Sequence, residues 1–219
     1  MSGGFLIIVG AGPGISLAMA RRFGIEGFSI ALLARSEEKL RSYQHELATA
    51  GVRTLFRVAD CADDLELGAA LEDLQTQAGA PDVLLYNAAN IKWKNLLDDT
   101  GAGLTADFQV NVAGALTATR AVLPRMRAAN RGILLFTGSL FATDPAPAFG
   151  SLSISKAGLR NLAYGLSKSL QGTAIRVHYL AIQGRVSADD PQRNPQAIAE
   201  RCWQLASGAI DAAPVEVLI

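Results

Sequence analysis

The glycine-rich segment 10–14, which reads Gly-Ala-Gly-Pro-Gly, most constrains the fold of this chain. An apolar run, Phe5–Val9, precedes it, and apolar residues at helical spacing follow over 15–23. Where a buried strand turns through glycines into a helix, backbone N–H groups and the helix dipole point at one place. The segment therefore predicts a phosphate-binding loop in a β-α-β unit, and the alternative is a glycine turn that binds nothing.

Short apolar runs alternate with longer amphipathic segments along the rest of the chain. The expected strands are 5–9, 29–33, 52–58, 82–86, 132–137, 175–182 and 214–219. The expected helices are 15–23, one capped by Ser36, 63–78, 104–126, 153–171 and 195–206. Strands that are apolar on both faces and alternate with helices favour a parallel sheet covered on both sides. We therefore expect a doubly wound (Rossmann) α/β fold, three layers α/β/α with a seven-stranded parallel sheet, as a single domain over 1–219.

Composition and charge exclude several classes of function. Half of the residues are apolar and 18% are charged, enough apolar material for a sizeable core. The 20 basic and 20 acidic residues balance, so nothing in the net charge favours nucleic acid or an anionic membrane as a partner. The uncharged stretch 1–20 lacks a basic start and is interrupted by glycines, which argues against a signal peptide or a membrane anchor.

The two cysteines, Cys61 and Cys202, do not form a disulfide framework, and no Cys or His spacing indicates a metal site. We expect a reducing, cytoplasmic location.

Arg35 stands 21 residues after Gly14, at the end of the second expected strand. An acidic residue there would hydrogen-bond a ribose 2′-hydroxyl and indicate NAD(H). Arginine pairs instead with a 2′-phosphate, so NADP(H) is preferred over NAD(H). The alternative is that Arg35 is a solvated side chain at a helix start.

With these residues in view, nearly the whole chain resembles the short-chain dehydrogenase/reductase family. Segment 10–16 matches the family's nucleotide loop, with Ser16 in place of the last glycine. Tyr86-Asn87-Ala88-Ala89 corresponds to the family's Asn-Asn-Ala-Gly stretch, of which the second Asn and the Ala are kept. The resemblance implies cofactor contacts from the residues of the loop and of the strand ends: Gly10, Gly12, Pro13, Gly14, Ile15, Arg35, Asp60, Cys61, Asn87, Ala88, Lys156 and Gly184.

The same resemblance places the catalytic residues at Asn111, Ser139 and Lys156. The family's Tyr-x-x-x-Lys signature keeps Lys156, but Leu152 stands where the catalytic Tyr belongs. This is typical of a divergent branch of the family. Leu152 cannot donate a proton, although a water held by Ser139 and Lys156 could substitute. Each site residue also has a structural alternative: a turn serine, a solvated helix lysine and a buried asparagine.

Two functions compete on this reading. The first is an NADP(H)-dependent oxidoreductase acting on a small carbonyl or alcohol through an atypical active site. The second is a catalytically impaired nucleotide-binding protein, such as a sensor or scaffold; a structural remnant that binds nothing is a third reading, which the glycine loop argues against. The resemblance also implies a homodimer or homotetramer through helices 104–126 and 153–171. The substrate segment, about 184–213, is short and polar over 189–195, so we expect a small lid.

Overall fold

A parallel β-sheet forms the centre of the fold in the computed structural model, which describes residues 3–210 and 213–219. Its strands are β1 (Phe5–Val9), β2 (Ser29–Ala34), β3 (Thr54–Val58), β4 (Val83–Tyr86), β5 (Gly132–Thr137), β6 (Ile175–Ala181) and β7 (Glu216–Leu218). The strands lie in the order β3-β2-β1-β4-β5-β6-β7, and every neighbouring pair is parallel. The predicted doubly wound, seven-stranded sheet is confirmed.

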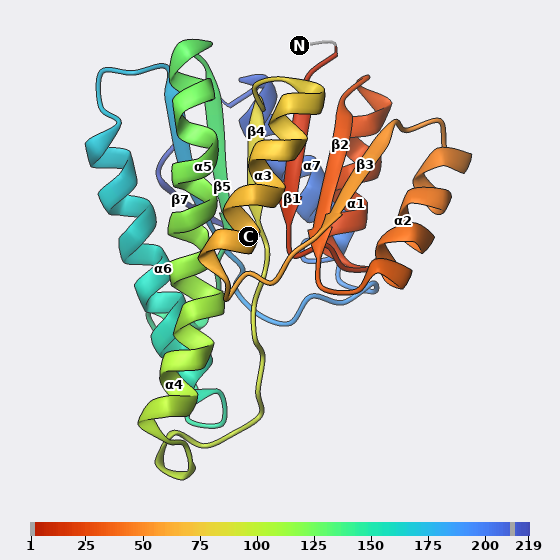
Figure 1. The fold of residues 1–219 in the computed structure, drawn as a ribbon. Helices are drawn as coiled ribbons and strands as arrows, with labels where there is room; N and C mark the ends of the chain where they lie inside the picture. Colours follow the sequence, from red (N-terminus) through yellow and green to blue (C-terminus); the bar gives the residue numbers. More distant parts are fainter. Residues whose placement is uncertain (1–2, 211–212) are drawn as a thin grey trace.

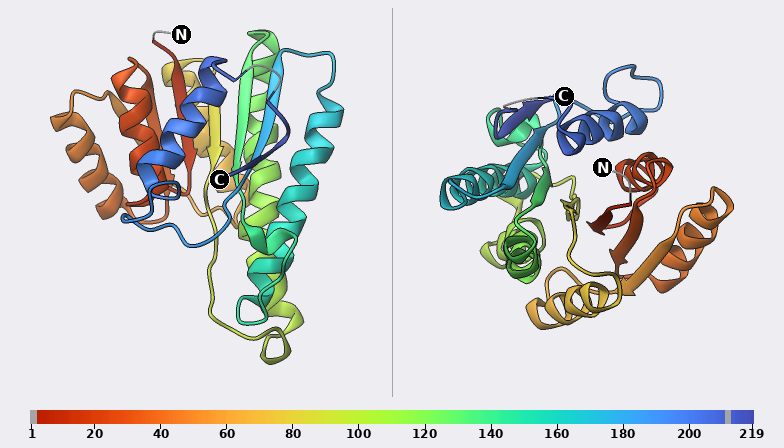
Figure 2. Two further views of the ribbon diagram at one scale, coloured as in Figure 1. Left: turned by 180° about the vertical axis from the view of Figure 1, so that it is seen from behind. Right: turned by 90° about the horizontal axis from the view of Figure 1, so that it is seen from above.

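Helices cover both faces of this sheet (Figures 1 and 2). On one face lie α1 (Ile15–Ile25), α2 (Glu37–Thr49) and α7 (Pro195–Ser207); on the other lie α3 (Asp64–Ala78), α5 (Gly114–Ala128) and α6 (Gly150–Ser169). Alternate strand residues supply the two cores: Leu6 and Ile8 face the first layer, whereas Ile7 and Val9 face the second. Strands buried on both faces explain the unbroken apolar runs in the sequence.

The helix starts follow local capping chemistry. Ser36 caps α2 by accepting a hydrogen bond from the backbone N–H of Lys39, as its position predicts. Asp63 caps α3 by accepting from two backbone N–H groups of the first turn, at 2.9 Å each. Helix α6 begins at Gly150, three residues earlier than expected, directly after the bridge between Lys94 and Phe149.

The predicted long helix over 104–126 is present as a continuous helical segment over 101–128, but a π-helical turn divides it. The structure has α4 (Gly101–Phe108), a π-helical turn over Gln109–Ala113, and then α5. The hydroxyl of Tyr86 on β4 donates to the carbonyl of Val110, which lies inside this turn. An inserted side chain of this kind is a known cause of a break in the i→i−4 pattern. Helix α4 thereby continues beyond the end of the sheet (Figure 1).

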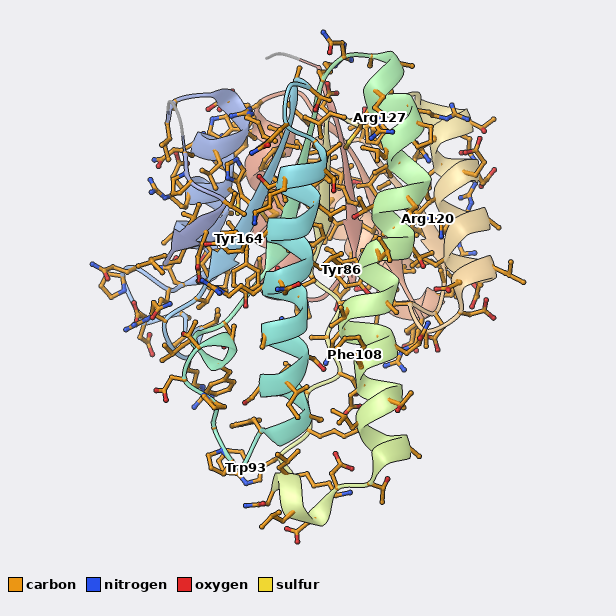
Figure 3. All side chains as sticks on the ribbon, turned by 90° about the vertical axis from the view of Figure 1, so that its left-hand side faces the viewer. Tyr86, Trp93, Phe108, Arg120, Arg127 and Tyr164 are labelled. Atoms are coloured by element: carbon orange, nitrogen blue, oxygen red, sulfur yellow. The ribbon has the colours of Figure 1, made fainter. Side chains whose placement is uncertain are left out.

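Helices α5 and α6 run side by side on the outside of the molecule (Figure 3). Phe108, Leu116 and Ile154 are exposed apolar residues of α4, α5 and α6. The final strand is shorter than expected, because only Glu216–Leu218 pairs with β6. In the described part of the chain, no helix is both long and apolar enough to cross a membrane.

Candidate active site

The candidate site lies at the carboxyl ends of β1, β4 and β5. Strands β1 and β4 are neighbours in the sheet, but the chain leaves β1 toward β2 and leaves β4 toward β5, on opposite sides. The strand order therefore reverses between them, and the two connections diverge to leave a crevice. Segment 10–14 enters this crevice from β1, and segment 87–91 enters it from β4.

The glycine loop turns sharply at Gly10, which adopts a φ of +85°. The backbone N–H groups of Gly10 and Ala11 both donate to the carbonyl of Leu33 on β2, at 2.9 Å each. Gly14 then begins α1 and offers no side-chain acceptor to the first turn of that helix. The N–H groups of this first turn therefore have no side-chain cap, and their binding of an anion stays a prediction.

Ser16, which replaces the last glycine of the loop, belongs to a hydrogen-bonded chain across the crevice floor. Its buried hydroxyl donates to the carbonyl of Gly10 at 3.0 Å and accepts from the amide of Asn87 at 2.9 Å. The amide oxygen of Asn87 accepts from the hydroxyl of Thr137 at 2.8 Å. Asn87 is predicted to contact the cofactor. In the structure, its amide nitrogen and oxygen both make hydrogen bonds that hold the loop to β4 and β5.

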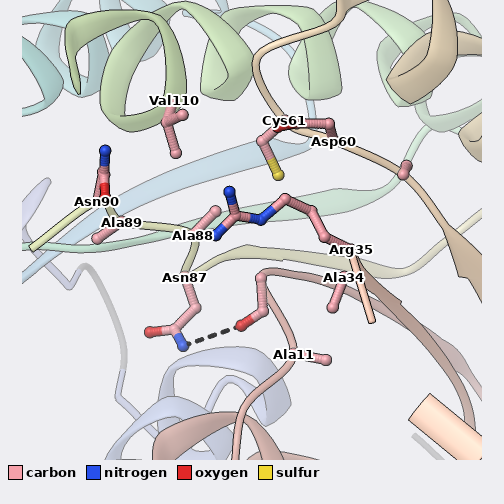
Figure 4. Close-up of a pocket in the computed structure, with 12 residues that line it drawn as sticks. Ala11, Ala34, Arg35, Asp60, Cys61, Asn87, Ala88, Ala89, Asn90 and Val110 are labelled. Carbon is pink, nitrogen blue, oxygen red and sulfur yellow. Dashed lines mark hydrogen bonds between the residues drawn. The ribbon is translucent and has the colours of Figure 1, made fainter. Parts of the chain in front are cut away.

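A first cavity of about 230 Å³ opens beside the loop (Figure 4). Its wall contains six of the predicted cofactor residues, namely Gly10, Arg35, Asp60, Cys61, Asn87 and Ala88. Within the described residues, Arg35 has no ion-pair or hydrogen-bond partner, although its side chain reaches across the cavity. Burial raises the pKa of the Cys61 thiol to about 11, so this cysteine is a packing residue and not a reactive one.

A second cavity of about 390 Å³ adjoins the first, and Asn87 and Ala89 line both. Its remaining predicted residues come from the loop, from the β5 end, from α6 and from the segment after β6: Gly12, Pro13, Gly14, Ile15, Ser139, Leu152, Lys156 and Gly184. Ile91, Ile182 and Val186 make much of the other wall apolar. The structure thus gathers the predicted residues, apart from Asn111, along two adjoining cavities.

Lys156 is buried, and its ammonium donates to the backbone carbonyl of Thr137 at 2.6 Å. Burial away from water disfavours the charged form and lowers the pKa of this amine to about 8. Leu152 lies one helical turn before Lys156 on the same side of α6, which is why both reach the cavity. The structural alternative of a solvated helix lysine is excluded.

Ser139 begins the short 3₁₀ turn Leu140–Ala142 and accepts from the backbone N–H of Phe141 at 3.2 Å. Behind it lies Tyr179 of β6, which the sequence analysis did not assign. The Tyr179 hydroxyl accepts from the N–H of Ser139 at 3.1 Å and is 3.2 Å from the carbonyl of Lys156. Burial raises the pKa of this phenol to about 12. Tyr179 therefore holds the backbone of Ser139 and of Lys156 but does not line the cavity.

Replacing Tyr179 by phenylalanine is expected to lower the free energy of unfolding by about 1–2 kcal/mol, because the backbone N–H of Ser139 loses its acceptor and the Lys156 carbonyl loses one of its donors. Urea unfolding followed by circular dichroism measures the change. The control is Tyr164→Phe, since Tyr164 shares its partner Glu216 with Arg160 near the surface; we expect a change below about 0.5 kcal/mol. Equal losses in the two variants would contradict this role for Tyr179.

Asn111 does not line either cavity. It is buried in the π-helical turn, where its amide oxygen accepts from the N–H of Asn90 at 2.6 Å. The amide nitrogen of Asn111 lies 3.4 Å from the backbone carbonyl of Asn90. The side chain of Asn111 therefore braces the segment after β4, and its catalytic role stays a prediction.

Asp107 is a second buried residue that the sequence analysis missed. It is fully buried on α4, where it accepts from Asn90 at 2.7 Å and from Ser151 of α6 at 2.6 Å, and it pairs with Lys92 at 2.6 Å. These contacts join the segment after β4 to two helices. No sequence signal distinguishes Asp107 from a solvated helix aspartate, because its partners come from distant parts of the chain.

The expected lid is smaller than its sequence range. Residues 195–207 belong to α7, whose apolar face packs against α1 on the sheet. The stretch before it is held locally, because Arg193 pairs with Asp190 at 2.6 Å and donates to the carbonyl of Gln183 at 3.0 Å. Residues 211–212 of the predicted segment lie outside the described residues. Only the part near Gly184 and Val186 reaches the second cavity.

Within the part of the chain that the structure describes, no group of three His, Cys, Asp or Glu side chains is placed to hold a metal ion.

Comparison with known proteins identifies families and structures that are similar to this chain. The short chain dehydrogenase family matches residues 5–190. The chain is 29% identical over 181 residues to oxidoreductase asL5 of Sarocladium schorii, covering 83% of this chain and 72% of that protein. It is 28% identical to the uncharacterized oxidoreductase YvrD of Bacillus subtilis, covering 79% of this chain and 65% of that protein.

Among solved structures, a metagenomic short-chain oxidoreductase in complex with NADP superposes with a TM-score of 0.90 at 30% identity, covering 100% of this chain and 96% of the other. An actinorhodin polyketide ketoreductase with NADPH has a TM-score of 0.91 at 24% identity and shares the fold. The match over residues 5–190, together with the two adjoining cavities at the ends of β1, β4 and β5, shows that the chain belongs to the short chain dehydrogenase family of oxidoreductases.

Proposed function

We propose that the protein is an NADP(H)-dependent oxidoreductase that acts on a small carbonyl or alcohol. One observation carries the proposal: two adjoining cavities place Arg35 at one end of the crevice, and Ser139 and Lys156 at the other. The loop at the N-terminus of α1 lies between these ends. A dinucleotide has a phosphate in its middle and a nicotinamide at one end, and the residues present fit this order of groups.

The chain's own residues have separate tasks in binding. The free N–H groups of the first turn of α1 would bind the pyrophosphate, because Gly14 supplies no competing side chain. Arg35, without a partner among the described residues, would pair with the 2′-phosphate. Asp60 and Cys61 would flank the adenine end of the first cavity.

When bound, the nicotinamide supplies the hydride that reduces the substrate carbonyl. Ser139 would donate its hydroxyl hydrogen to the carbonyl oxygen and hold it at the cavity wall. Lys156 places a cation in the same cavity, and Leu152 presents only carbon there. This active site is atypical for the family that the chain resembles, since the tyrosine position holds Leu152.

The oxidation of NADPH by the purified protein tests the proposal. A panel of small ketones and aldehydes, such as 2,3-butanedione and 4-nitrobenzaldehyde, is mixed with NADPH, and the absorbance at the nicotinamide band is followed. We expect turnover of at least one carbonyl and NADPH binding by calorimetry. Binding without turnover across the panel would favour the second candidate below, and no binding at millimolar NADPH would remove both.

Arg35→Ala is expected to weaken NADPH binding by about 10- to 100-fold, the effect of losing one charge-assisted hydrogen-bond pair to a phosphate. The affinity for NADH should change by less than about threefold, because NADH has no 2′-phosphate. Calorimetric titration of both cofactors measures the two effects. Arg41→Ala is the control, since Arg41 pairs with Glu37 on the exposed side of α2. A parallel loss for NADPH and NADH would refute the preference for NADP(H).

The second candidate is a nucleotide-binding protein without catalysis, such as a sensor or scaffold. Two observations favour it: Leu152 lines the second cavity, and Asn111 is bonded to Asn90 outside that cavity. Neither feature changes the first cavity beside Arg35, and each means one polar side chain fewer in the second cavity. The panel experiment separates the two candidates.

We also propose a homodimer or homotetramer that associates through α5 and α6. These helices lie side by side on the outside of the molecule (Figure 3). Leu116 of α5 and Ile154 of α6 are exposed apolar residues. Light scattering at micromolar concentration measures the mass; a monomer would overturn this proposal.

Cys61 and Cys202 are free and buried, which supports a reducing, cytoplasmic location as a further proposal.

A further inference from the structure

The second cavity contains a single ionisable side chain among the described residues that line it. Its wall consists of glycines, apolar side chains, the amide of Asn87, the hydroxyls of Thr137 and Ser139, and the amine of Lys156. Addition of a hydride to a carbonyl carbon leaves a negative oxygen that needs a proton. If the proposed function holds, that proton comes from a group at this wall or from a water that such a group holds.

Three other side chains in this region could donate a proton, but each contacts a backbone group and lies outside the second cavity. The phenol of Tyr179 lies behind the wall, bonded to the backbone of Ser139 and Lys156. The phenol of Tyr86 donates to the carbonyl of Val110, and His178 contacts the carbonyl of Pro214 at 2.9 Å. None of the three lines the second cavity.

Lys156 has donors to spare. An ammonium carries three N–H donors, and the carbonyl of Thr137 is the one acceptor that the described residues offer this ammonium. The side chain reaches the cavity from α6 beside Leu152, and Ser139 stands on the same wall. Two donors therefore remain for groups that enter the cavity.

The geometry points to Lys156 as the proton donor of the reduction, a role that rests on the proposed function. Bound NADPH would supply the reducing hydride for the new C–H bond, and the C=O electron pair would move to oxygen. An Nζ–H bond of Lys156 breaks and the O–H bond of the alcohol forms, which leaves a neutral amine. The amine regains its proton from water before the next turnover.

The charges around Lys156 are consistent with this role. Three acidic side chains from neighbouring elements are paired: Asp107 with Lys92, Glu216 with Arg160, and Asp190 with Arg193. On β6, Arg176 donates to the carbonyls of Leu205 and Ala206, and His178 contacts the carbonyl of Pro214. Burial then governs the amine and lowers its pKa to about 8. The amine is charged and able to donate near neutral pH, and neutral and able to accept a proton from an alcohol above pH 8.

The first test measures the amine without any turnover. The chain has five lysines, so ¹³C-labelled lysine gives few Cε resonances, and the Lys156 resonance is the one missing in Lys156→Met. We expect this resonance to titrate near pH 8 in the cofactor-free protein. At saturating NADPH, the rate of carbonyl reduction should fall as the pH rises through an inflection. We expect this inflection within about one pH unit of the value at which the Lys156 resonance titrates.

The second test replaces the donor. Lys156→Ala should lower kcat at least about 100-fold, the usual contribution of a positioned proton donor. Methylamine or ethylamine in the buffer should restore part of the activity, because the shortened side chain leaves room for a small amine. Lys156→Met fills that room and should not respond to amines. Lys168→Ala, an exposed lysine of the same helix, is the matched control and should keep wild-type kcat.

The outcomes separate the two levels of the proposal. A wild-type protein that reduces carbonyls, while Lys156→Ala keeps kcat within about threefold or gains nothing from amines, overturns the role of Lys156 alone. A Lys156 resonance that titrates near 10.5 overturns it as well. A wild-type protein that binds no NADPH and reduces nothing overturns the proposed function, and this inference with it.

Discussion

Replacing Gly10 by alanine is expected to destabilise the fold by about 2–5 kcal/mol and to weaken NADPH binding about 100-fold. Gly10 has a φ of +85°, where a Cβ costs roughly 1–2 kcal/mol. That Cβ would also lie 2.3 Å from the backbone nitrogen of Ala88, which cannot move without shifting the end of β4. The resulting displacement costs about 1–3 kcal/mol more. Because the loop carries the N–H groups that we propose face the phosphates, a shift of about 1 Å would account for the loss of affinity.

Chemical denaturation and calorimetry measure these two effects. Gly12→Ala is the matched control for stability, because a Cβ at Gly12 meets no atom within 4 Å and its φ is not positive. We expect that variant to change the free energy of unfolding by less than about 1 kcal/mol. A Gly10→Ala protein as stable as the wild type would show that the loop and the Ala88 backbone can separate at little cost.

The second large effect is a gain of stability in Lys156→Met at neutral pH. The folded chain holds a charged amine in a site that disfavours charge. Lowering the pKa from 10.5 to about 8 corresponds to about 3 kcal/mol of lost stability. Methionine is of similar length and carries no charge. The carbonyl of Thr137 loses its hydrogen bond, which costs about 1 kcal/mol, so we expect a net gain of about 2 kcal/mol.

The pH dependence gives this prediction its sign. Between pH 8 and pH 10.5 the unfolded chain binds a proton at Lys156 that the folded chain has already released, so wild-type stability rises with pH in this window. The advantage of Lys156→Met should thus be complete below pH 8 and be lost by about pH 10.5. Urea unfolding at several pH values measures it, with Lys168→Met as the exposed control. An advantage that stays constant with pH would mean that packing, and not charge, causes it.

The sheet, and the position of the glycine loop and Arg35 at one cavity, could be predicted because their signals are local. A strand, a glycine turn and a helix follow one another in segment 5–25, and Arg35 comes directly after the next strand. The helical period alone places Leu152 and Lys156 on one side of α6. Parallel strands then bring such strand ends to a common edge.

The substrate end was harder to predict, because its features depend on contacts between distant residues. The π-helical turn follows from the bond between Tyr86 and Val110, 24 positions apart. Asp107 is buried by Ser151, 44 positions away, and Tyr179 meets Ser139 across two strands. Asn111 occupies the expected place in sequence, but its amide turns to Asn90 and away from the cavities. Helical and strand periodicities carry no information on such pairs.

The hydrogen-bonded chain from Ser16 through Asn87 to Thr137 has a consequence for the energetics of nucleotide binding. It joins the phosphate loop to the ends of β4 and β5 before any ligand arrives. The conformational entropy of the loop is therefore lost during folding, and little of it remains to be lost on association. Such preorganisation would let the loop bind a phosphate group at little further entropic cost.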